Sequence, residues 1–536
     1  MSVGLEGQPT GARLVATRRD TQAEISGLAD DADPPRPSPL PCPATATYPQ
    51  RRDLLGPCSA EGGLLAVDVG GGGIRVGFYD PPGSLRYLIS EPEPGAGDQF
   101  DPERTWLAVA AAIRELTSRE ILVRAVGVTA HLATVLADAD GCPTTRALLW
   151  RDNRAWREAQ ELQAALGGEL ESVTGRRASA EFAAARLRFL ARSSPDVLSR
   201  TRWLLSLKDY LVLKLTGRAC TDPASASYTQ LFDVRQRRWS PAIAAECGIP
   251  PHVLPAVCPS TALAGRVNRG AAALTGLVRG TPVAAGCPDG SAGGLGLGAC
   301  YPGVTVDISG TTDVLLHVTD IPADHGGRGA VLNAYVLDQL WAMGGPTGLT
   351  GGGLDWLTAT LGYRSTAAAY QAMGPVLAAA DPGDLMIRTT LTGRRAPGWN
   401  PRLRGRIDGI SVEHGPAHLL RAAEEGSAFE VRLGIDVLRA IGTPVTTVIT
   451  GGVHAATART MQLRADAWDA QVGTTGDAHA SLRGAALAGA VAAGYFADVT
   501  EATDAMVPPL RWYRPALAAV QAADLRFRRW RAAMAA

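Results

Sequence analysis

The chain has 536 residues, which is more than one compact core sustains, since cores stop growing at about 250–300 residues. Two domains are therefore expected. Lys plus Arg and Asp plus Glu number 52 each, so no global field draws the chain to nucleic acid or to an anionic membrane. The eight cysteines stand singly without a C-x-x-C pair, which excludes a zinc or dithiol signature and fits a reducing, cytoplasmic compartment.

The first stretch, residues 1–61, differs in composition from the remainder. It contains DDADPPRPSPLPCP and shows no sustained apolar period. Such a segment buries too little apolar surface to offset its chain entropy, so we expect a disordered N-terminal tail. The N-terminus lacks the apolar core of a secretory signal, and no run reaches the roughly 18 apolar residues that a membrane span needs.

In chain order, the first structured element is a hairpin. The segment LLAVDVGGGGIRVGFYD, which begins at Leu64, is an apolar strand, a glycine turn and an alternating strand. A helical pattern follows, and after it strands, helices and strands again. The expected ranges are a helix at 102–118, strands at 124–129 and 134–138, several helices within 151–216, and strands at 281–286 and 303–309.

The second half repeats this plan. Residues 303–318 predict a strand, a Gly/Thr turn and a strand, and a strand at 445–450 ends in Gly451 and Gly452. Residues 481–495 predict a helix of small residues. Two related halves, each with a turn suited to phosphate, indicate a duplicated α/β domain with a cleft between the copies.

Two turns are candidate phosphate sites. The first contains Gly70, Gly71, Gly72 and Gly73, between Asp68 and Arg75. Glycines at a hairpin tip let backbone N–H groups approach a phosphate closely, and a carboxylate at the strand end suits hydrated Mg²⁺. The second turn, 309–312, offers backbone amides and hydroxyls. Each pattern alone is more often an ordinary turn, but two of them, one per half, are less often a coincidence.

Asp289 is the candidate catalytic carboxylate. It follows an apolar strand and precedes a helix of small residues, at the edge of the sheet where α/β proteins bind ligands. The same position predicts a helix N-cap, and the two roles are compatible if the carboxylate points into the cleft. Gly451 and Gly452 would let a bare backbone lie against an adenine or ribose, although alone they predict only a strand-to-helix turn.

In this order and spacing, the motifs resemble the FGGY family of carbohydrate kinases from about Leu64 to about Tyr495. Further motifs, individually weak, are Trp150-Arg-Asp152-Asn-Arg154, Lys208-Asp209-Tyr210, Thr221-Asp222, Gly393-Arg-Arg395-Ala-Pro397 and Ala465-Asp466. The resemblance implies an α/β fold of two actin/ribonuclease-H-like domains with a cleft between them. Residues 62–301 would form the domain with the substrate site and catalytic base, and residues 302–536 the nucleotide-binding domain.

The resemblance also implies an ATP-dependent kinase that phosphorylates a hydroxyl of a small sugar, with ATP and Mg²⁺ as cofactors. Asp289 is then the general base, and Asp68 and Asp289 together place Mg²⁺ and the phosphate. The implied nucleotide residues are Gly70, Gly71, Gly72, Gly73, Arg75, Gly310, Thr311, Thr312, Gly351, Gly451 and Gly452. The implied substrate residues are His131, Asp152, Asp289 and Gly290. For His131, a loop histidine satisfied by the backbone is an equal alternative, and a homodimer is left open as the oligomeric state.

The chain departs from the family pattern in its first loop. That loop is usually D-x-G-T-x-S-x-R, but both hydroxyl positions are glycine here, Gly71 and Gly73. Each charge-assisted hydrogen bond is worth roughly 1.5–3 kcal/mol, so reduced or reshaped ATP turnover is expected rather than its loss. Gly290 is more typical of the family's gluconate kinases than of its pentulose kinases, and Leu132 and Ala133 replace the Arg-Glu pair of its glycerol kinases.

Three functions follow from these residues. The leading one is a kinase of a ketopentose such as xylulose, because the pattern from Trp150 through Trp399 resembles the xylulokinases. The second is a gluconate kinase, or a kinase of another sugar acid or polyol. The third, from another class, is a catalytically weak sensor that binds sugar or nucleotide. The altered first loop motivates the sensor, and retention of Asp68, Asp289 and Thr311 opposes it.

Overall fold

The computed structural model describes residues 51–53, 62–81, 83–94, 98–322, 329–454 and 457–535. Of the expected tail, residues 1–50 and 54–61 lie outside these ranges. Residues 51–53 form β1 (Arg51–Asp53), which pairs antiparallel with β4 (Leu85–Glu91). Within the described ranges, no helix is both long and apolar enough to cross a bilayer.

The N-terminal half is built on a mixed sheet around β2 (Gly63–Gly70), whose sequence GLLAVDVG is buried along its whole length. The described strands run in the order β1-β4-β3-β2-β6-β15-β14, with β16 also paired to β6. The β4-β3-β2 neighbours are antiparallel, whereas β2-β6 and β6-β15 are parallel. The other strands are β3 (Gly73–Tyr79), β6 (Val123–Ala130), β14 (Leu263–Arg266), β15 (Pro282–Ala284) and β16 (Cys287–Pro288).

The C-terminal half repeats this arrangement. Its sheet has the order β19-β20-β18-β17-β23-β24-β25. The β20-β18-β17 neighbours are antiparallel, and β17-β23 and β23-β24 are parallel, which matches the first sheet strand for strand. The strands are β17 (Thr305–Ser309), β18 (Asp313–Thr319), β19 (Val331–Ala334), β20 (Trp341–Pro346), β23 (Thr447–Gly451), β24 (Gln471–Thr474) and β25 (Arg511–Tyr513). The duplication expected from the sequence is confirmed.

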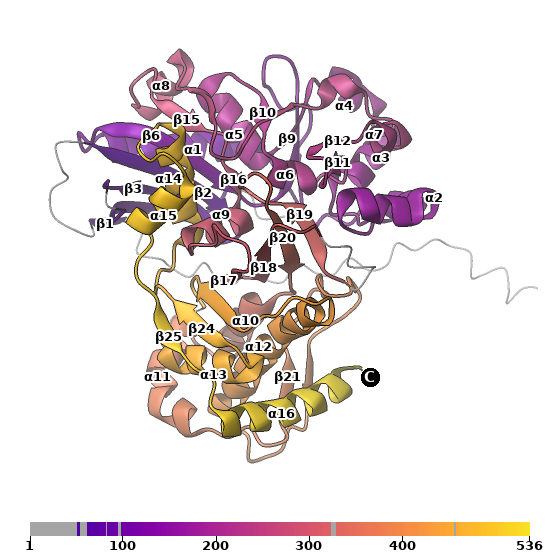
Figure 1. Cartoon of the computed structure of the whole chain (residues 1–536), viewed down its shortest axis with the longest axis vertical. Coiled ribbons are helices and arrows are strands. Elements are labelled where there is room, and N and C mark those ends of the chain that lie inside the picture. Colours follow the sequence, from indigo (N-terminus) through magenta and orange to yellow (C-terminus); the bar gives the residue numbers. More distant parts are fainter. Residues whose placement is uncertain are drawn as a thin grey trace, which may run out of the picture. The chain divides into compact units, whose positions relative to one another are not determined.

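Smaller sheets and helices cover the two main sheets (Figure 1). The minor strands are β5 (Gln99–Phe100), β7 (Ala133–Ala137), β8 (Ala147–Leu149), β9 (Trp203–Ser206), β10 (Cys220–Thr221), β11 (Phe232–Asp233), β12 (Arg238–Trp239), β13 (Ala256–Val257), β21 (Met386–Arg388) and β22 (Arg406–Asp408). The N-terminal helices are α1 (Pro102–Thr117), α2 (Trp156–Thr174), α3 (Ala183–Ser193), α4 (Pro195–Arg200), α5 (Leu207–Thr216), α6 (Pro223–Ser227), α7 (Pro241–Glu246), η1 (Pro251–Val253), α8 (Arg269–Thr275) and α9 (Asp289–Gly296). The C-terminal helices are α10 (Thr350–Thr360), α11 (Thr366–Ala379), α12 (Pro416–Ala440), α13 (Ala458–Trp468), α14 (Ala480–Ala492), α15 (Val499–Met506) and α16 (Leu517–Ala535).

Local sequence explains where the helices begin and end. Helix α1 starts after Asp101, whose side chain accepts a hydrogen bond from Glu103 N, and Pro102 takes the first helical position. Helix α5 starts with a capping box between Ser206 and Asp209. These caps set where the two helices begin, and the apolar faces of both helices pack into the core of the first sheet.

Helix α14 brings the C-terminal half against the sheet of the N-terminal half (Figure 1). Its Gly484 lies on α9, where a Cβ would clash with the carbonyl oxygen of Ala292. Its Ala485 lies on β6, where Gly127 leaves room for its carbonyl oxygen. Backbones that approach this closely need glycine. The helix that begins at Asp289 is therefore packed directly on an element of the other half.

Candidate active site

The first glycine turn joins β2 to β3 and carries an ion pair. Asp68 and Arg75 face each other across the hairpin, with Arg75 Nη1 3.0 Å from Asp68 Oδ2. The other oxygen, Asp68 Oδ1, is buried and has no hydrogen-bond partner among the described residues. A buried acceptor without a donor is costly, so this oxygen suits a cation or a water that a cation carries.

Gly71 and Gly73 differ in the room that they leave for a side chain. A Cβ built on Gly71 meets no heavy atom within 4 Å, whereas a Cβ on Gly73 would lie 2.5 Å from the carbonyl oxygen of Glu91. Gly73 also has a φ of +118°, where L side chains are strained. The hairpin therefore requires glycine at position 73 but not at position 71.

The second turn, between β17 and β18, is enclosed by glycines that were expected to frame the nucleotide. A Cβ on Gly351 would clash with the carbonyl oxygen of Gly310, and a Cβ on Gly452 with that of Ser309. Gly351 opens α10, and Gly452 follows β23. The second turn, the start of α10 and the segment after β23 thus approach one another at positions where glycine presents no side chain.

The remaining predicted nucleotide residues lie beside this meeting point. Thr311 O accepts a hydrogen bond from Gly352 N at 2.9 Å, and Thr312 is next to it in the turn. Gly451 is paired with Ile308 in the parallel β17–β23 ladder. The structure therefore gathers the C-terminal members of the predicted set around one turn.

A buried ionic cluster around Arg464 contacts the strands on both sides of the second turn. Arg464 Nη1 lies 2.7 Å from Asp307 Oδ2, and Arg464 Nη2 donates to Ser309 Oγ at 2.7 Å. Asp313 is also buried, with Oδ2 3.7 Å from Arg464 Nη2. Burial and then the charge of Asp313 raise the pKa of Asp307 to about 7, although Arg464 and Thr450 oppose this. The sequence reasoning missed this cluster, because Arg464 is more than 150 residues away from Asp307 and Ser309 in the chain.

Asp289 begins α9 directly after β16, whose Cys287 and Pro288 pair with Thr129 and Ala130 of β6. Its carboxylate accepts a hydrogen bond from Gly290 N at 2.8 Å. Burial raises the pKa of Asp289, and the charge of Asp68 raises it further, against the opposing effects of His131, the Gly290 N–H and Arg395. A raised pKa makes this carboxylate a stronger base.

Asp289 lies between the two glycine turns. Asp68 of β2 is paired in register with Thr129 of β6, which is also paired with Cys287 of β16, so Asp68 and the start of α9 at Asp289 lie at the same end of two strands that flank β6. On the other side, a Cβ on Gly290 would lie 3.3 Å from Val314, which follows the second turn. The Ser481 hydroxyl of α14 donates to Asp289 O at 2.9 Å. Asp289 is thus close to Asp68 beside the first turn, and its neighbour Gly290 is close to Val314 after the second turn.

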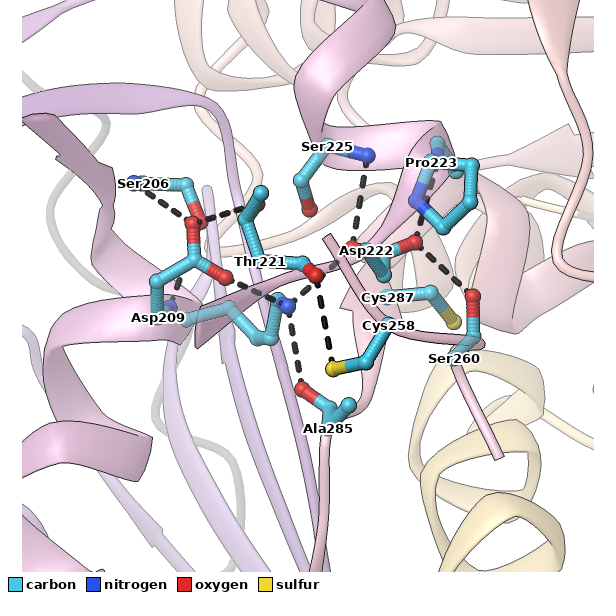
Figure 2. A network of polar contacts seen from close by, with 12 residues as sticks. Ser206, Asp209, Thr221, Asp222, Pro223, Ser225, Cys258, Ser260, Ala285 and Cys287 are labelled. Carbon is cyan, nitrogen blue, oxygen red and sulfur yellow. Dashed lines mark hydrogen bonds and ion pairs between the residues drawn. The ribbon is translucent and has the colours of Figure 1, made fainter. Parts of the chain in front are cut away.

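A buried network holds the strand that leads to Asp289 (Figure 2). Lys208 Nζ donates to the carbonyl oxygen of Ala285 at 2.9 Å and forms ion pairs with Asp209 Oδ1 at 2.5 Å and Asp222 Oδ1 at 3.0 Å. Asp222 also accepts from Ser260 Oγ at 2.8 Å and caps α6. The sequence indicated the Lys208-Asp209 pair only as a family motif, and the structure gives it a physical role.

On the acceptor side, His131 is buried and its Nε2 lies 3.1 Å from Glu93 Oε2. Phe100 packs edge-on against the imidazole. Burial lowers the pKa of His131, but the hydrogen bond and charge of Glu93, with Asp289, outweigh it and leave the pKa raised. The imidazole thus has a side-chain partner, while its Nδ1 has none among the described residues.

A second ion pair near Asp289 joins the two halves. Glu181 of the N-terminal half lies 2.9 Å from Arg395 Nη2 and accepts from Trp399 Nε1 at 3.0 Å, both in the C-terminal half. The Arg395 guanidinium lies over the ring of Trp150, 4.7 Å from its centroid. A cavity of about 40 Å³ beside this ion pair is lined by residues of the N-terminal half, among them Trp150, Glu181 and Tyr228.

Asp152 is a predicted substrate residue for which no contact with His131, Asp289 or Gly290 is found among the described residues. Its carboxylate is bound by Arg154, with Nη2 2.8 Å from Oδ2. The sequence reasoning missed Glu93 and Glu181, which are single acidic residues outside any motif. Only the folded contacts with His131 and Arg395 reveal them.

These features fit an α/β phosphotransferase, because two glycine turns lie near a partly buried carboxylate in a duplicated α/β fold. Two family models match the chain: the N-terminal domain of the FGGY family of carbohydrate kinases over residues 64–296, and its C-terminal domain over residues 307–493. The chain belongs to the FGGY family of carbohydrate kinases. The expected two-domain actin-like fold and the catalytic class, an ATP-dependent carbohydrate kinase, are thereby confirmed.

Individual relatives differ in their acceptors. The chain is 30% identical over 467 residues to a glycerol kinase of Nocardia farcinica, covering 82% of this chain and 91% of the relative. It is 28% identical over 436 residues to the xylulose kinase of Escherichia coli, covering 79% and 89%. The crystal structure of a "xyloylose kinase" from Brucella ovis is 26% identical with a TM-score of 0.75, covering 88% of this chain and 98% of that one.

Proposed function

We propose that the protein transfers the γ-phosphoryl group of ATP to a hydroxyl of a small sugar, with Asp289 as the general base. The observation that carries this proposal is the position of Asp289 between Asp68 of the first turn and Val314 beyond the second. Two turns with accessible backbone amides, one from each half, suit the phosphates of one nucleotide.

In the proposed reaction, Asp289 accepts the proton of the acceptor hydroxyl while the hydroxyl oxygen attacks the γ-phosphorus. The bond from that phosphorus to the bridging oxygen breaks, so the products are a sugar phosphate and ADP. Catalysis rests mainly on positioning and on neutralisation of charge by backbone amides and Arg75. The base contributes about 10²–10⁴-fold.

The described residues fit Mg²⁺ as a partner of the nucleotide. Asp68 Oδ1 is buried with no partner among the described residues, and Asp289 is near enough for its pKa to respond to Asp68. Those residues contain no group of three or more His, Cys, Asp or Glu that would hold a metal alone, so phosphate oxygens and waters must complete the coordination. Bound there, Mg²⁺ would neutralise charge on the transferred group.

The acceptor is proposed to be a ketopentose such as xylulose, with gluconate or another sugar acid second. Arg395 Nε and Arg176 Nη1 are buried and have no acceptor among the described residues. Burial raises the pKa of Tyr228, Arg176 and Arg395 oppose this, and Asp289 adds to it, so each of the three charged groups lies within electrostatic range of Tyr228. Unpartnered N–H donors suit an accepting oxygen, and a ketose carbonyl or a carboxylate, which only accepts, satisfies them without bringing a further proton that needs its own acceptor.

A panel of acceptors tests the proposal. Purified protein with ATP and Mg²⁺ is given xylulose, ribulose, gluconate, sedoheptulose, erythritol or glycerol, and ADP release is measured. We expect xylulose to give the highest kcat/KM, and gluconate to do so if the sugar-acid alternative holds. Calorimetry with sugar and with ADP covers the sensor alternative: tight binding without turnover of any acceptor would contradict a kinase. We further propose a cytoplasmic location for this activity.

A further inference from the structure

His454 occupies an unusual place in the nucleotide half. It is buried and lies two residues after Gly452. Its backbone N donates to Ser309 O at 3.3 Å, which ties it to the second turn. A Cβ on Gly351 would lie 2.8 Å from His454 Nε2, so the imidazole covers the first turn of α10. His454 therefore contacts the second turn through its backbone and the first turn of α10 through its ring.

The ring is held by an acidic partner on α10. His454 Nε2 lies 3.3 Å from Asp355 Oδ2, one helical turn beyond Gly351. Thr366 Oγ1 donates to Asp355 Oδ1 at 2.6 Å, so the carboxylate itself is fixed. The pKa of Asp355 is lowered, because the hydrogen bond and charge of His454, with Thr366, outweigh the effect of burial. A carboxylate on one ring nitrogen fixes the orientation of an imidazole.

The glycine run of α10 explains why a ring is useful here. Gly351, Gly352 and Gly353 present no side chain to a ligand. A purine is a flat aromatic group, and an aromatic side chain is the surface on which a base binds by stacking. The backbone of these glycines alone would give the flat face of the purine no aromatic ring on which to stack.

We propose that the His454 imidazole is the stacking surface for the purine of the donor nucleotide, and that Asp355 is a positioning residue for this ring. The proposal rests on the proposed nucleotide site in the C-terminal half and adds the residues that hold the base.

Isothermal titration of ADP, without sugar, tests the proposal on His454→Ala, His454→Phe and Asp355→Ala. We expect the ADP Kd and the KM for ATP to rise about tenfold in His454→Ala, because one stacking contact is lost. His454→Phe should restore most of the affinity, and Asp355→Ala should fall between the two. The KM for the sugar should not change, whereas the melting temperature should fall in His454→Ala and Asp355→Ala, because each substitution removes one partner of a largely buried pair. His252→Ala, at an exposed histidine of η1, is the matched control and should bind as the wild type does.

The outcomes separate this inference from the proposed function. If the wild type binds no ADP, the nucleotide site itself is wrong. If the wild type binds ADP and His454→Ala binds equally well, the stacking role is wrong while the kinase proposal stands. Tighter binding by His454→Ala would show that the ring obstructs the site, which also contradicts the inference. Failure of Phe to restore affinity would indicate that the hydrogen bond, and not the aromatic face, matters.

Discussion

Lys208→Met is a substitution whose cost follows from the geometry of one buried group. Lys208 is 1% exposed and lies between Asp209 and Asp222, whose side chains are 2% and 0% exposed. Methionine keeps the volume but leaves two buried carboxylates without a cation. Breaking a buried ion pair in this way costs about 3–5 kcal/mol. For a domain of this size, the melting temperature should fall on the order of 10 °C.

The same substitution should reduce turnover, because Lys208 also donates to the Ala285 carbonyl that precedes the Asp289 segment. Scanning calorimetry and ADP release measure the two effects. Lys214→Met, on the same helix, is the matched control: its partner Glu103 is 37% exposed, so the change should stay within about 1 kcal/mol. Adding Asp222→Asn to Lys208→Met should recover part of the stability. A melting temperature of Lys208→Met within 2 °C of the control would refute the reasoning.

Three further predictions concern the two turns and the acceptor side. Gly71→Thr should restore a hydrogen bond to phosphate and lower the KM for ATP about tenfold relative to Gly71→Ala. Gly73→Ser should instead lower the melting temperature, because a Cβ at position 73 clashes with the Glu91 carbonyl oxygen. An unchanged KM for ATP in Gly71→Thr would count against a phosphate at this turn. Because folding raises the pKa of Asp307 to about 7, the stability gained from its protonated form is fully present below pH 4 and is lost as the pH rises through about 7. The C-terminal half should therefore have a lower melting temperature at pH 8 than at pH 5.5. Asp307→Asn should flatten that profile, and an unchanged slope would contradict the assignment. Arg395→Gln should raise the acceptor KM about tenfold or more without altering ADP binding, and a nucleotide effect alone would place Arg395 elsewhere.

Much of the fold could be predicted from local sequence. The segment around Asp68 carries a buried strand, four glycines and an alternating strand, and these features specify a hairpin with little help from the rest of the chain. The same holds for the turn after Ser309. Because both turns end strands of matching order in the two sheets, their likeness in sequence was already evidence for the duplication.

The candidate site could be predicted only in part. Asp289 and the glycines stand in motifs, so spacing was enough to select them. Glu181 and Arg395 are separated by more than 200 residues, and their ion pair exists only because the two halves meet. Gly71 and Gly73 look alike in sequence, yet one position is open and the other is closed by Glu91. Such differences depend on packing, which no local pattern carries.

Sugar-dependent ADP release by Asp289→Asn is the most direct test of whether the Asp289 carboxylate is the catalytic base. Burial and Asp68 raise the pKa of this carboxyl, so the ionised group destabilises the fold as the pH rises through that pKa, and the neutral amide should keep or raise the melting temperature. We predict that turnover of Asp289→Asn falls at least about 100-fold while ADP binding and stability persist. Turnover near the wild-type rate in a folded Asp289→Asn protein would contradict it.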